Sequence, residues 1–316
     1  MVYYSYFDTV SSVYNYAGDS DEKMADVCEQ TITFLEKYND WFDIYYEHSG
    51  VNNLKTINDN AGKQPVSCDP ELITFLQYAK DLYAKTHGRM NIMLGAVLRI
   101  WHNYRTEALN GGDAKVPPLQ DLEEANKHTS IDLLEIDAEK GTVYISDPEA
   151  SIDVGAVGKG YACERAAEYL RSIGAEGYVL NIGGNIRTVG VKPDGSGWST
   201  GIRNPDNSGT FSLRVMLKDT ACVTSGNYER YYTVDGVRYH HIIDPDTLFP
   251  ARHFASITII TPDSGLADVL STALYCTSYE EGLEIASSFE NTEVVWISED
   301  GTIQYTDGIK EMIVSK

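Results

Sequence analysis

The sequence is poor in basic residues and in the features that mark membrane proteins. Its 316 residues include 25 Lys and Arg against 47 Asp and Glu, which gives a net charge of −22. A negative field of this size repels phosphate backbones and anionic lipid head groups, so a nucleic-acid-binding or membrane-surface protein is disfavoured. No apolar run approaches the roughly 20 residues that span a bilayer. We therefore expect a soluble chain with no transmembrane segment and no nucleic-acid partner.

Paired cysteines are also missing. The chain has five cysteines, an odd number, with wide spacing and no CxxC pair. A disulfide framework or a zinc site is therefore disfavoured, and scattered core thiols are expected. These cysteines are Cys28, Cys68, Cys163, Cys222 and Cys276.

The first residues, MVYYSYFDTVSSV, lack the basic and apolar regions of a signal peptide. Two interpretations follow from this stretch alone. Either the protein stays in the cytoplasm, or the native gene encodes an export signal upstream of it.

The chain is rich enough in apolar and aromatic residues to fold. Hydrophobic residues make up 42% of it, with 22 Tyr, 8 Phe and 4 Trp, so disorder is disfavoured. Helical patterns dominate residues 1–130 and strand patterns dominate residues 131–316. We predict an α+β fold with helical insertions around a largely antiparallel sheet core, as one continuous unit with a soft boundary near residue 130.

Helices are predicted where apolar residues recur at a spacing of three to four next to capping residues. One helix begins at Asp69-Pro70 and ends at Gly88, where the cap, the first-turn proline and the terminal glycine agree. Further helices are predicted from Asp19-Ser20 onward and over 119–128, 159–173 and 266–288. Strands are predicted over 133–137, 142–146, 178–184, 186–191, 211–217, 221–225, 231–243, 256–261 and 293–305.

The stretch SIDVGAVGKGYACERAAEYL, residues 151–170, has the composition of a phosphate-binding loop. Asp153 ends a strand-like run, the glycines of GAVGKG allow close backbone approach, and Lys159 stands at the start of a helix, whose N-terminus favours anions. The spacing matches neither a P-loop nor a Rossmann fingerprint. A strand-to-helix turn that merely needs glycine explains the stretch equally well.

Two later stretches add to this pattern. LNIGGNIRTVG, residues 180–190, is by itself typical of a bulge or a hairpin turn. In LADVLSTALY, residues 266–275, Asp268 and Thr272 are one helical turn apart and share one helix face. A carboxylate and a hydroxyl suit Mg²⁺ that also binds phosphate oxygens. Taken alone, an Asp and a Thr at this spacing usually mark a solvated surface.

A histidine pair lies in YHHIIDPDTLFP, residues 239–250. Histidine is the side chain most easily tuned for proton transfer near neutral pH. Because side chains alternate along a strand, His240 and His241 are expected on opposite faces, so only one can point into a given site. A surface or core histidine in a hairpin is the alternative.

In their order along the chain, the four stretches resemble the ApbE family of FAD:protein FMN transferases. The family block D-x-G-x-x-x-K-G-x-x-x-(D/E) is matched at 153–164, N-x-G-G-(D/N)-I at 181–186, T-S-G-x-Y-E-R at 224–230, H-I-I-D-P at 241–245, and A-D-x-(L/M)-(S/T)-T at 267–272. Segments 7–10, 52–58 and 88–101 resemble three upstream blocks. Phe7, Asn91 and Leu248 stand where the family pattern has Met, Asp and Gly, and the first two flank the expected FAD pocket.

The resemblance implies an ApbE-like, T-fold-like architecture and a Mg²⁺-dependent reaction. FMN would pass from FAD to a Thr or Ser hydroxyl of an acceptor protein, with a phosphoester formed and AMP released. His241 would take the proton of the acceptor hydroxyl, and Lys159 would pair with phosphate. The implied metal ligands are the carbonyl of Ala156 and the side chains of Asp268, Ser271 and Thr272. The implied FAD contacts are Phe7, Tyr45, Asn58, Arg89, Met90, Asn91, Asp153, Lys159 and Ile242.

The resemblance also implies partners and a location. The partners are FAD and an acceptor protein with a Thr or Ser flavinylation motif. Related proteins are exported and often lipid-anchored, so we expect an extracytoplasmic, membrane-anchored lipoprotein whose signal lies upstream of this chain, and a cytoplasmic protein if no such signal exists. Two alternatives stay open: hydrolysis of FAD to FMN and AMP, and a flavin carrier without turnover. A structural or adhesion module is disfavoured, because it explains none of the ordered motifs.

Overall fold

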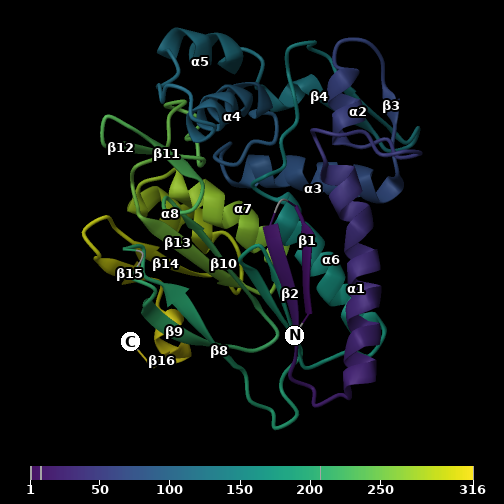
Figure 1. Cartoon of the computed structure of the whole chain (residues 1–316), viewed down its shortest axis with the longest axis vertical. Helices are drawn as coiled ribbons and strands as arrows, with labels where there is room; N and C mark the ends of the chain where they lie inside the picture. The colour runs from purple at the N-terminus through teal and green to yellow at the C-terminus, as the bar shows by residue number, and fades with distance from the viewer. Residues whose placement is uncertain (1, 8, 207, 316) are drawn as a thin grey trace. The chain divides into compact units, whose positions relative to one another are not determined.

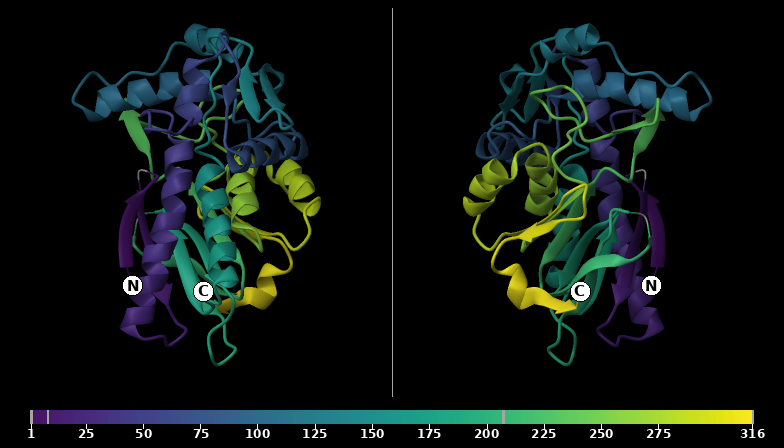
Figure 2. Two further views of the ribbon diagram at one scale, coloured as in Figure 1. Left: turned by 90° about the vertical axis from the view of Figure 1, so that its right-hand side faces the viewer. Right: turned by 90° about the vertical axis from the view of Figure 1, so that its left-hand side faces the viewer.

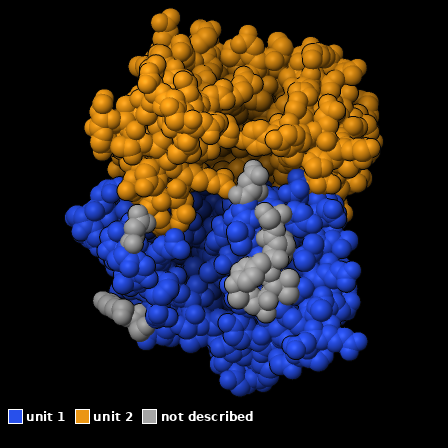
Figure 3. Space-filling view, viewed as in Figure 1, with its two compact units in different colours: residues 1–39, 157–226, 254–316 blue, residues 40–156, 227–253 orange. Residues whose placement is uncertain are grey.

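The computed structural model describes residues 2–7, 9–206 and 208–315, which form two compact units (Figures 1 and 3). Unit 1 comprises residues 1–39, 157–226 and 254–316, and unit 2 comprises residues 40–156 and 227–253. Each unit therefore combines separate stretches of the chain. This division differs from the boundary predicted near residue 130, because residues 227–253 leave the sheet-rich half and pack with the helices of unit 2.

Unit 1 is built on an eight-stranded antiparallel sheet with the strand order β1-β2-β6-β7-β10-β13-β14-β15. These strands are β1 (Val2–Tyr6), β2 (Thr9–Asn15), β6 (Tyr178–Ile182), β7 (Asn185–Val189), β10 (Ala221–Gly226), β13 (Ser256–Thr261), β14 (Glu293–Ile297) and β15 (Ile303–Tyr305). The predicted α+β class with an antiparallel core is confirmed. Strand β13 is buried at every position, because the sheet is covered on both faces.

Two helices pack on one face of this sheet (Figure 2). Helix α6 (Gly158–Ser172) contacts β6 and β7, and helix α7 (Ser264–Tyr275) contacts β10 and β13. On the other face, a shared apolar cluster joins the sheet to a smaller sheet. That smaller sheet consists of β8 (Trp198–Arg203), β9 (Phe211–Leu217) and β16 (Ile313–Ser315).

The helix predicted over 266–288 is two helices, so that prediction is wrong in its length. Helix α7 ends at Tyr275, and α8 (Tyr279–Ser287) begins after Ser278, whose side chain accepts the N–H of Glu281. The chain turns between them because the Thr277 hydroxyl bonds back to the Leu274 carbonyl and Ser278 caps a new helix. Unit 1 also contains α9 (Ile309–Met312) and most of α1 (Asp21–Phe42), which ends within unit 2.

Unit 2 is mainly helical. Its elements are α2 (Leu54–Asp59), β3 (Val66–Ser67), α3 (Pro70–Lys85), α4 (Gly95–Leu109), α5 (Leu119–Asn126), the 3₁₀ helix η1 (Ile131–Leu133), β4 (Leu134–Asp137), β5 (Thr142–Ile145), β11 (Tyr231–Val234) and β12 (Val237–His240). Helix α3 begins as predicted, with the Asp69 carboxylate accepting the N–H of Glu71 and Pro70 in the first turn. Helix α4 was not among the predicted helices.

The core of unit 2 explains why residues 227–253 belong to it. Tyr232 of β11 and Leu248 pack in one apolar cluster with Trp101 of α4. The Trp101 indole N–H also donates to the Leu248 carbonyl at 2.8 Å. Burial of large aromatic and aliphatic side chains is the main favourable term in such packing.

The five cysteines are buried thiols outside any disulfide, as the sequence predicts. Within residues 2–7, 9–206 and 208–315, no helix has both the length and the apolar character that a membrane span requires.

Candidate functional site

In unit 1, the first turn of α6, which contains Lys159 and Gly160, contacts the middle of helix α7. The backbone N–H of Gly160 donates to Oδ2 of Asp268 at 2.8 Å, and Lys159 Nζ lies 3.7 Å from the same oxygen. A Cβ atom on Gly160 would lie 2.3 Å from the Ser264 carbonyl oxygen and 2.4 Å from Asp268 Cβ. Only glycine therefore allows α6 and α7 to approach this closely. Two motifs that are far apart in the sequence form one site here.

Asp268 is buried, with 5% of its surface exposed. The solvated-surface interpretation of this helix face is therefore wrong for Asp268, because α6 covers the side of α7 that the sheet does not. Among the described residues, no donor reaches Oδ1 of Asp268, so one carboxylate oxygen stays open for coordination.

Ser271 and Thr272 differ in their surroundings. The fully buried Ser271 hydroxyl donates to the Asp268 carbonyl at 2.9 Å and shares a 2.8 Å hydrogen bond with the Ser225 hydroxyl. Ser271 thus stabilises the turn that carries Asp268, and its metal contact stays a prediction. Thr272 is half-buried.

The donor set around Asp268 fits a hard cation such as Mg²⁺, since it offers a carboxylate oxygen and a nearby hydroxyl. In the part of the chain that the structure describes, no group of three or more His, Cys, Asp or Glu side chains could hold a metal ion. An ion beside Asp268 would therefore complete its coordination with other oxygens, such as those of phosphate or water. Ala156, the remaining predicted ligand, is the last residue of its stretch of unit 2.

Sequence reasoning missed Arg187. This residue lies on β7 and pairs with Glu164 of α6 through hydrogen bonds of 2.7 and 3.1 Å. The signal that could have found it is a charged residue inside the apolar strand IRTVGV, because a buried charge needs a partner. Glu164 was recognised only as the last position of a family block.

In unit 2, Asn58 and Asp153 shape one loop. The Asn58 side chain forms two hydrogen bonds with the main chain of Ile152, at 3.0 and 2.7 Å. The next residue, Asp153, donates its N–H to the Ile92 carbonyl, and its carboxylate accepts the N–H of Gly155. Asn58 thus holds the loop that presents Asp153, and contacts of both residues with FAD stay predictions.

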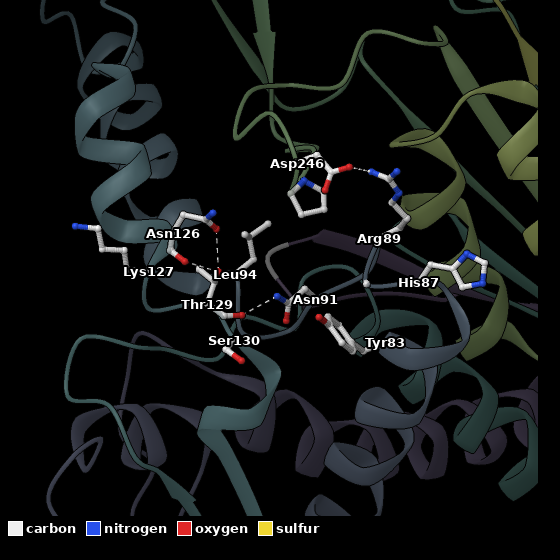
Figure 4. A pocket seen from close by; sticks show the side chains of 12 residues that line it. Tyr83, His87, Arg89, Asn91, Leu94, Asn126, Lys127, Thr129, Ser130 and Asp246 are labelled. Atoms are coloured by element: carbon white, nitrogen blue, oxygen red, sulfur yellow. Dashed lines mark hydrogen bonds and ion pairs between the residues drawn. The ribbon is translucent and has the colours of Figure 1, made fainter.

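A polar cavity of about 340 Å³ opens in unit 2 beside the segment 89–91 (Figure 4). Arg89 lines it and forms an ion pair with Asp246. Asn91 also lines it, but both ends of its amide are engaged: Nδ2 donates to the Thr129 carbonyl at 2.8 Å, and Oδ1 accepts the N–H of Met93 at 2.9 Å. The cavity therefore has a charged side and an amide side.

Met90 does not line this cavity. Its side chain lies in the core with 1% of its surface exposed. A contact of Met90 with FAD stays a prediction for its main chain only.

His240 and His241 have opposite surroundings, as the strand pattern predicts. His240 is 6% exposed, its Nε2 donates to the Ala251 carbonyl at 2.8 Å, and its Nδ1 accepts the N–H of Ile242. Burial, together with the nearby Arg252 and Arg238, lowers the pKa of His240 to about 4. His241 is exposed. Only His241 can therefore present its ring to a substrate.

The remaining predicted FAD contacts are Phe7, Tyr45 and Ile242. Phe7 has a positive φ of 56° and donates its N–H to Asn39 Oδ1, whereas Asp8 of the same FDTV segment lies outside the described residues. Tyr45 is 48% exposed, with its ring 5.6 Å from that of His102. Ile242 is buried. Their contacts with FAD stay predictions.

Comparison with known proteins places these features in a family. The sequence model of the ApbE family matches residues 7–296. A FAD:protein FMN transferase of Treponema pallidum is 31% identical over 277 residues, which cover 82% of this chain and 74% of that protein. Another, from Vibrio cholerae, is 30% identical over 286 residues, which cover 89% and 83%.

Solved structures agree with the sequence match. The crystal structure of the ApbE protein of Thermotoga maritima has a TM-score of 0.86 at 27% identity and covers 99% of both chains. The flavin transferase ApbE of Vibrio cholerae has a TM-score of 0.81 at 26% identity and covers 98% of both chains. The mixed α/β architecture of this chain is thus that of solved ApbE proteins. The chain belongs to the ApbE family.

Proposed function

We propose that this chain transfers FMN from FAD to a Thr or Ser hydroxyl of an acceptor protein, with Mg²⁺ required and AMP released. The observation that carries the proposal is the meeting of Lys159 and Gly160 with Asp268 at the start of α6. The chain is a transferase by its relationship to curated FAD:protein FMN transferases. The metal, the acceptor hydroxyl and the AMP product are the parts that we add.

In unit 1, the proposed role of the α6 N-terminus is to bind phosphate. The first N–H groups of a helix have no acceptor within the helix. That of Gly160 binds Asp268, so the N–H groups before it are the proposed phosphate donors, and Lys159 adds a positive charge beside them. Oδ1 of Asp268 and the hydroxyls of Thr272 and Ser271 are the proposed Mg²⁺ ligands in unit 1. A metal contact of the Ala156 carbonyl, which belongs to unit 2, stays a prediction. When bound, Mg²⁺ supplies charge neutralisation for the phosphates.

In unit 2, the proposed role of His241 is that of a general base. The acceptor hydroxyl gives its proton to the His241 imidazole as its oxygen attacks the phosphorus of the FMN half. The new oxygen–phosphorus bond replaces the bond to the AMP phosphate, which leaves with that electron pair. His240 cannot do this, because both its ring nitrogens are hydrogen-bonded and burial disfavours its protonation.

The proposed FAD contacts come from several parts of the chain. Arg89 and Asn91 line the polar cavity of unit 2, and Asp153 lies in the loop that Asn58 holds. Tyr45 offers an exposed aromatic ring that can stack on the flavin or on the adenine. Phe7, the main chain of Met90, and Ile242 complete the proposed set.

We also propose an extracytoplasmic location with a lipid anchor. The observation that motivates it is the membership of the family, whose exported members set the expectation. The native reading frame tests it: an upstream signal sequence with a lipidation site is expected, and a native start codon directly before Tyr3 would place the protein in the cytoplasm.

Product analysis tests the function. The protein is incubated with FAD and Mg²⁺, with and without an acceptor that carries a D-G-x-(S/T)-x-x-T motif, and AMP, FMN and acceptor-bound flavin are separated by chromatography. We expect equal amounts of AMP and acceptor-bound flavin, formed only with the acceptor. Free FMN and AMP without acceptor would identify a hydrolase, and intact FAD in both samples would identify a flavin carrier.

A further inference from the structure

A buried ion pair in unit 1 has no role in the chemistry described above. Arg187 is 2% exposed. Its guanidinium forms a bidentate pair with the Glu164 carboxylate: Nε donates to Oε2 at 2.7 Å, and Nη2 donates to Oε1 at 3.1 Å. Replacing such a pair by apolar side chains is often neutral or stabilising, so stability alone does not explain it. Its geometry points to a role in placing other groups.

Glu164 also binds the start of α7. Its Oε2 accepts the N–H of Ser264, the first residue of that helix, at 2.8 Å. This N–H has no partner within the helix, and a negative charge is favourable at a helix N-terminus. Arg187 in turn is fixed on β7, because its Nη1 donates to the Thr188 carbonyl and lies 3.2 Å from Asp219 Oδ1. Arg187, fixed on β7, therefore orients the Glu164 carboxylate, and this carboxylate binds the first residue of α7.

The Glu164–Ser264 bond has a counterpart one turn away. Gly160 precedes Glu164 by four residues on α6, and Asp268 follows Ser264 by four residues on α7. The Gly160–Asp268 bond of 2.8 Å is thus a second connection between the same two helices. Because each residue advances a helix by about 1.5 Å, a slip of α7 by one residue at the first connection would move Asp268 by about that distance. Such a displacement is large for a group that must bind next to reacting atoms.

We propose that Glu164, held by Arg187, is a positioning residue that fixes α7 so that the open carboxylate oxygen of Asp268 faces its metal. This inference rests on the proposed function, since it assigns Asp268 as a metal ligand. It adds a role for two residues that neither touch a substrate nor bind the metal.

The test measures metal affinity separately from stability. Mn²⁺ is titrated into the full chain with FAD present and no acceptor, free Mn²⁺ is read by electron paramagnetic resonance, and thermal unfolding is followed in parallel. For Glu164→Gln we expect Mn²⁺ affinity to fall by about 10-fold or more, with kcat for FMN transfer falling more than the KM for FAD rises. The matched control is Glu168→Gln, one turn further along α6 and exposed, for which both quantities should stay at the wild-type value.

Two further variants test the role of Glu164 if Glu164→Gln unfolds. The double variant Glu164→Gln/Arg187→Met removes both charges, so it should regain thermal stability while Mn²⁺ affinity stays low. Gly160→Ala changes the second connection and should weaken Mn²⁺ binding as well, because the added Cβ displaces Asp268. A folded Glu164 variant with wild-type Mn²⁺ affinity, or recovery of affinity together with stability in the double variant, would overturn the proposal. Absence of Mn²⁺ binding by the wild-type protein would instead refute the metal site of the proposed function.

Discussion

Gly160 and Asp268, which are 108 residues apart in the sequence, are joined by a hydrogen bond of 2.8 Å from the backbone N–H of the first to the Oδ2 oxygen of the second. The bond holds one oxygen of a buried carboxylate, and within residues 2–7, 9–206 and 208–315 no hydrogen-bond donor reaches the other. It also explains why the residue after Lys159 is glycine, since any side chain there would meet the backbone of α7.

Asp268→Ala should abolish Mg²⁺-dependent FMN transfer while the chain still folds. A metal that neutralises phosphate charge is worth several kcal/mol in the transition state, about 10²-fold to 10³-fold or more in rate. Because Asp268 is buried and accepts the N–H of Gly160, the loss should also cost about 1–3 kcal/mol of unfolding free energy. Transfer assays and circular dichroism melting measure the two effects, with exposed Asp307→Ala as the control. Full activity of Asp268→Ala would remove the metal assignment.

His241→Ala should lower FMN transfer by roughly 10²-fold or more and change FAD binding little, because a general base acts mainly in the transition state. His240→Gln is the neighbouring control: it should reduce stability, while the rate per folded molecule stays near the wild-type value. Rates and FAD affinities are measured for both variants. Equal losses of rate in the two variants would show that His241 is not the general base. A loss of activity in His241→Ala that is explained wholly by weaker FAD binding would show the same.

Acid should destabilise the protein partly through His240. The pKa of this ring is about 4 in the folded chain against 6.5 for an ordinary histidine. Between these values the unfolded chain binds the extra proton, so the contribution is complete above pH 6.5 and is lost as the pH falls toward 4. Urea unfolding at pH 7.5 and 4.5 should show the advantage of wild type over His240→Gln shrinking by about 2–3 kcal/mol. An advantage that is independent of pH would show that His240 is not buried as a neutral ring.

Asn91→Asp should destabilise unit 2, although the family pattern has Asp at this position. A carboxylate can accept the N–H of Met93 but cannot donate to the Thr129 carbonyl, so a loss of about 1–3 kcal/mol is expected in urea unfolding. Asn126→Asp is the matched control in the same cavity. Among the residues with a described position, the Asn126 side chain accepts from the Thr129 hydroxyl, which a carboxylate can also do, and donates to none. Equal effects of the two substitutions would contradict the assignment of the Asn91 amide.

The sequence predicts much of the fold and the family, because both depend on local signals. The cap and proline at Asp69-Pro70 predict the start of α3. The expected alternation agrees with a buried His240 at the end of β12 and an exposed His241 directly after it. The ordered motifs predict the family. Each of these features is contained in a short stretch of chain.

Other features depend on contacts between distant residues, so the sequence does not reveal them. Asp268 is buried because Gly160 lets α6 cover it, and Arg187 is buried because Glu164 is its partner. The return of residues 227–253 to unit 2 depends on the packing of Tyr232 with Trp101. The pattern of residues within one short segment does not reveal which distant segment it will contact.

We propose above that this chain attaches FMN to a protein hydroxyl in a Mg²⁺-dependent reaction. The most direct measurement is the intact mass of an acceptor protein after incubation with the chain, FAD and Mg²⁺, compared with the same mixture in excess EDTA and with an acceptor whose target Thr is replaced by Val. We expect one FMN adduct per acceptor in the first mixture and an unchanged mass in the other two. An unchanged acceptor in all three mixtures, or an equal adduct in EDTA, would refute the proposed Mg²⁺-dependent transfer.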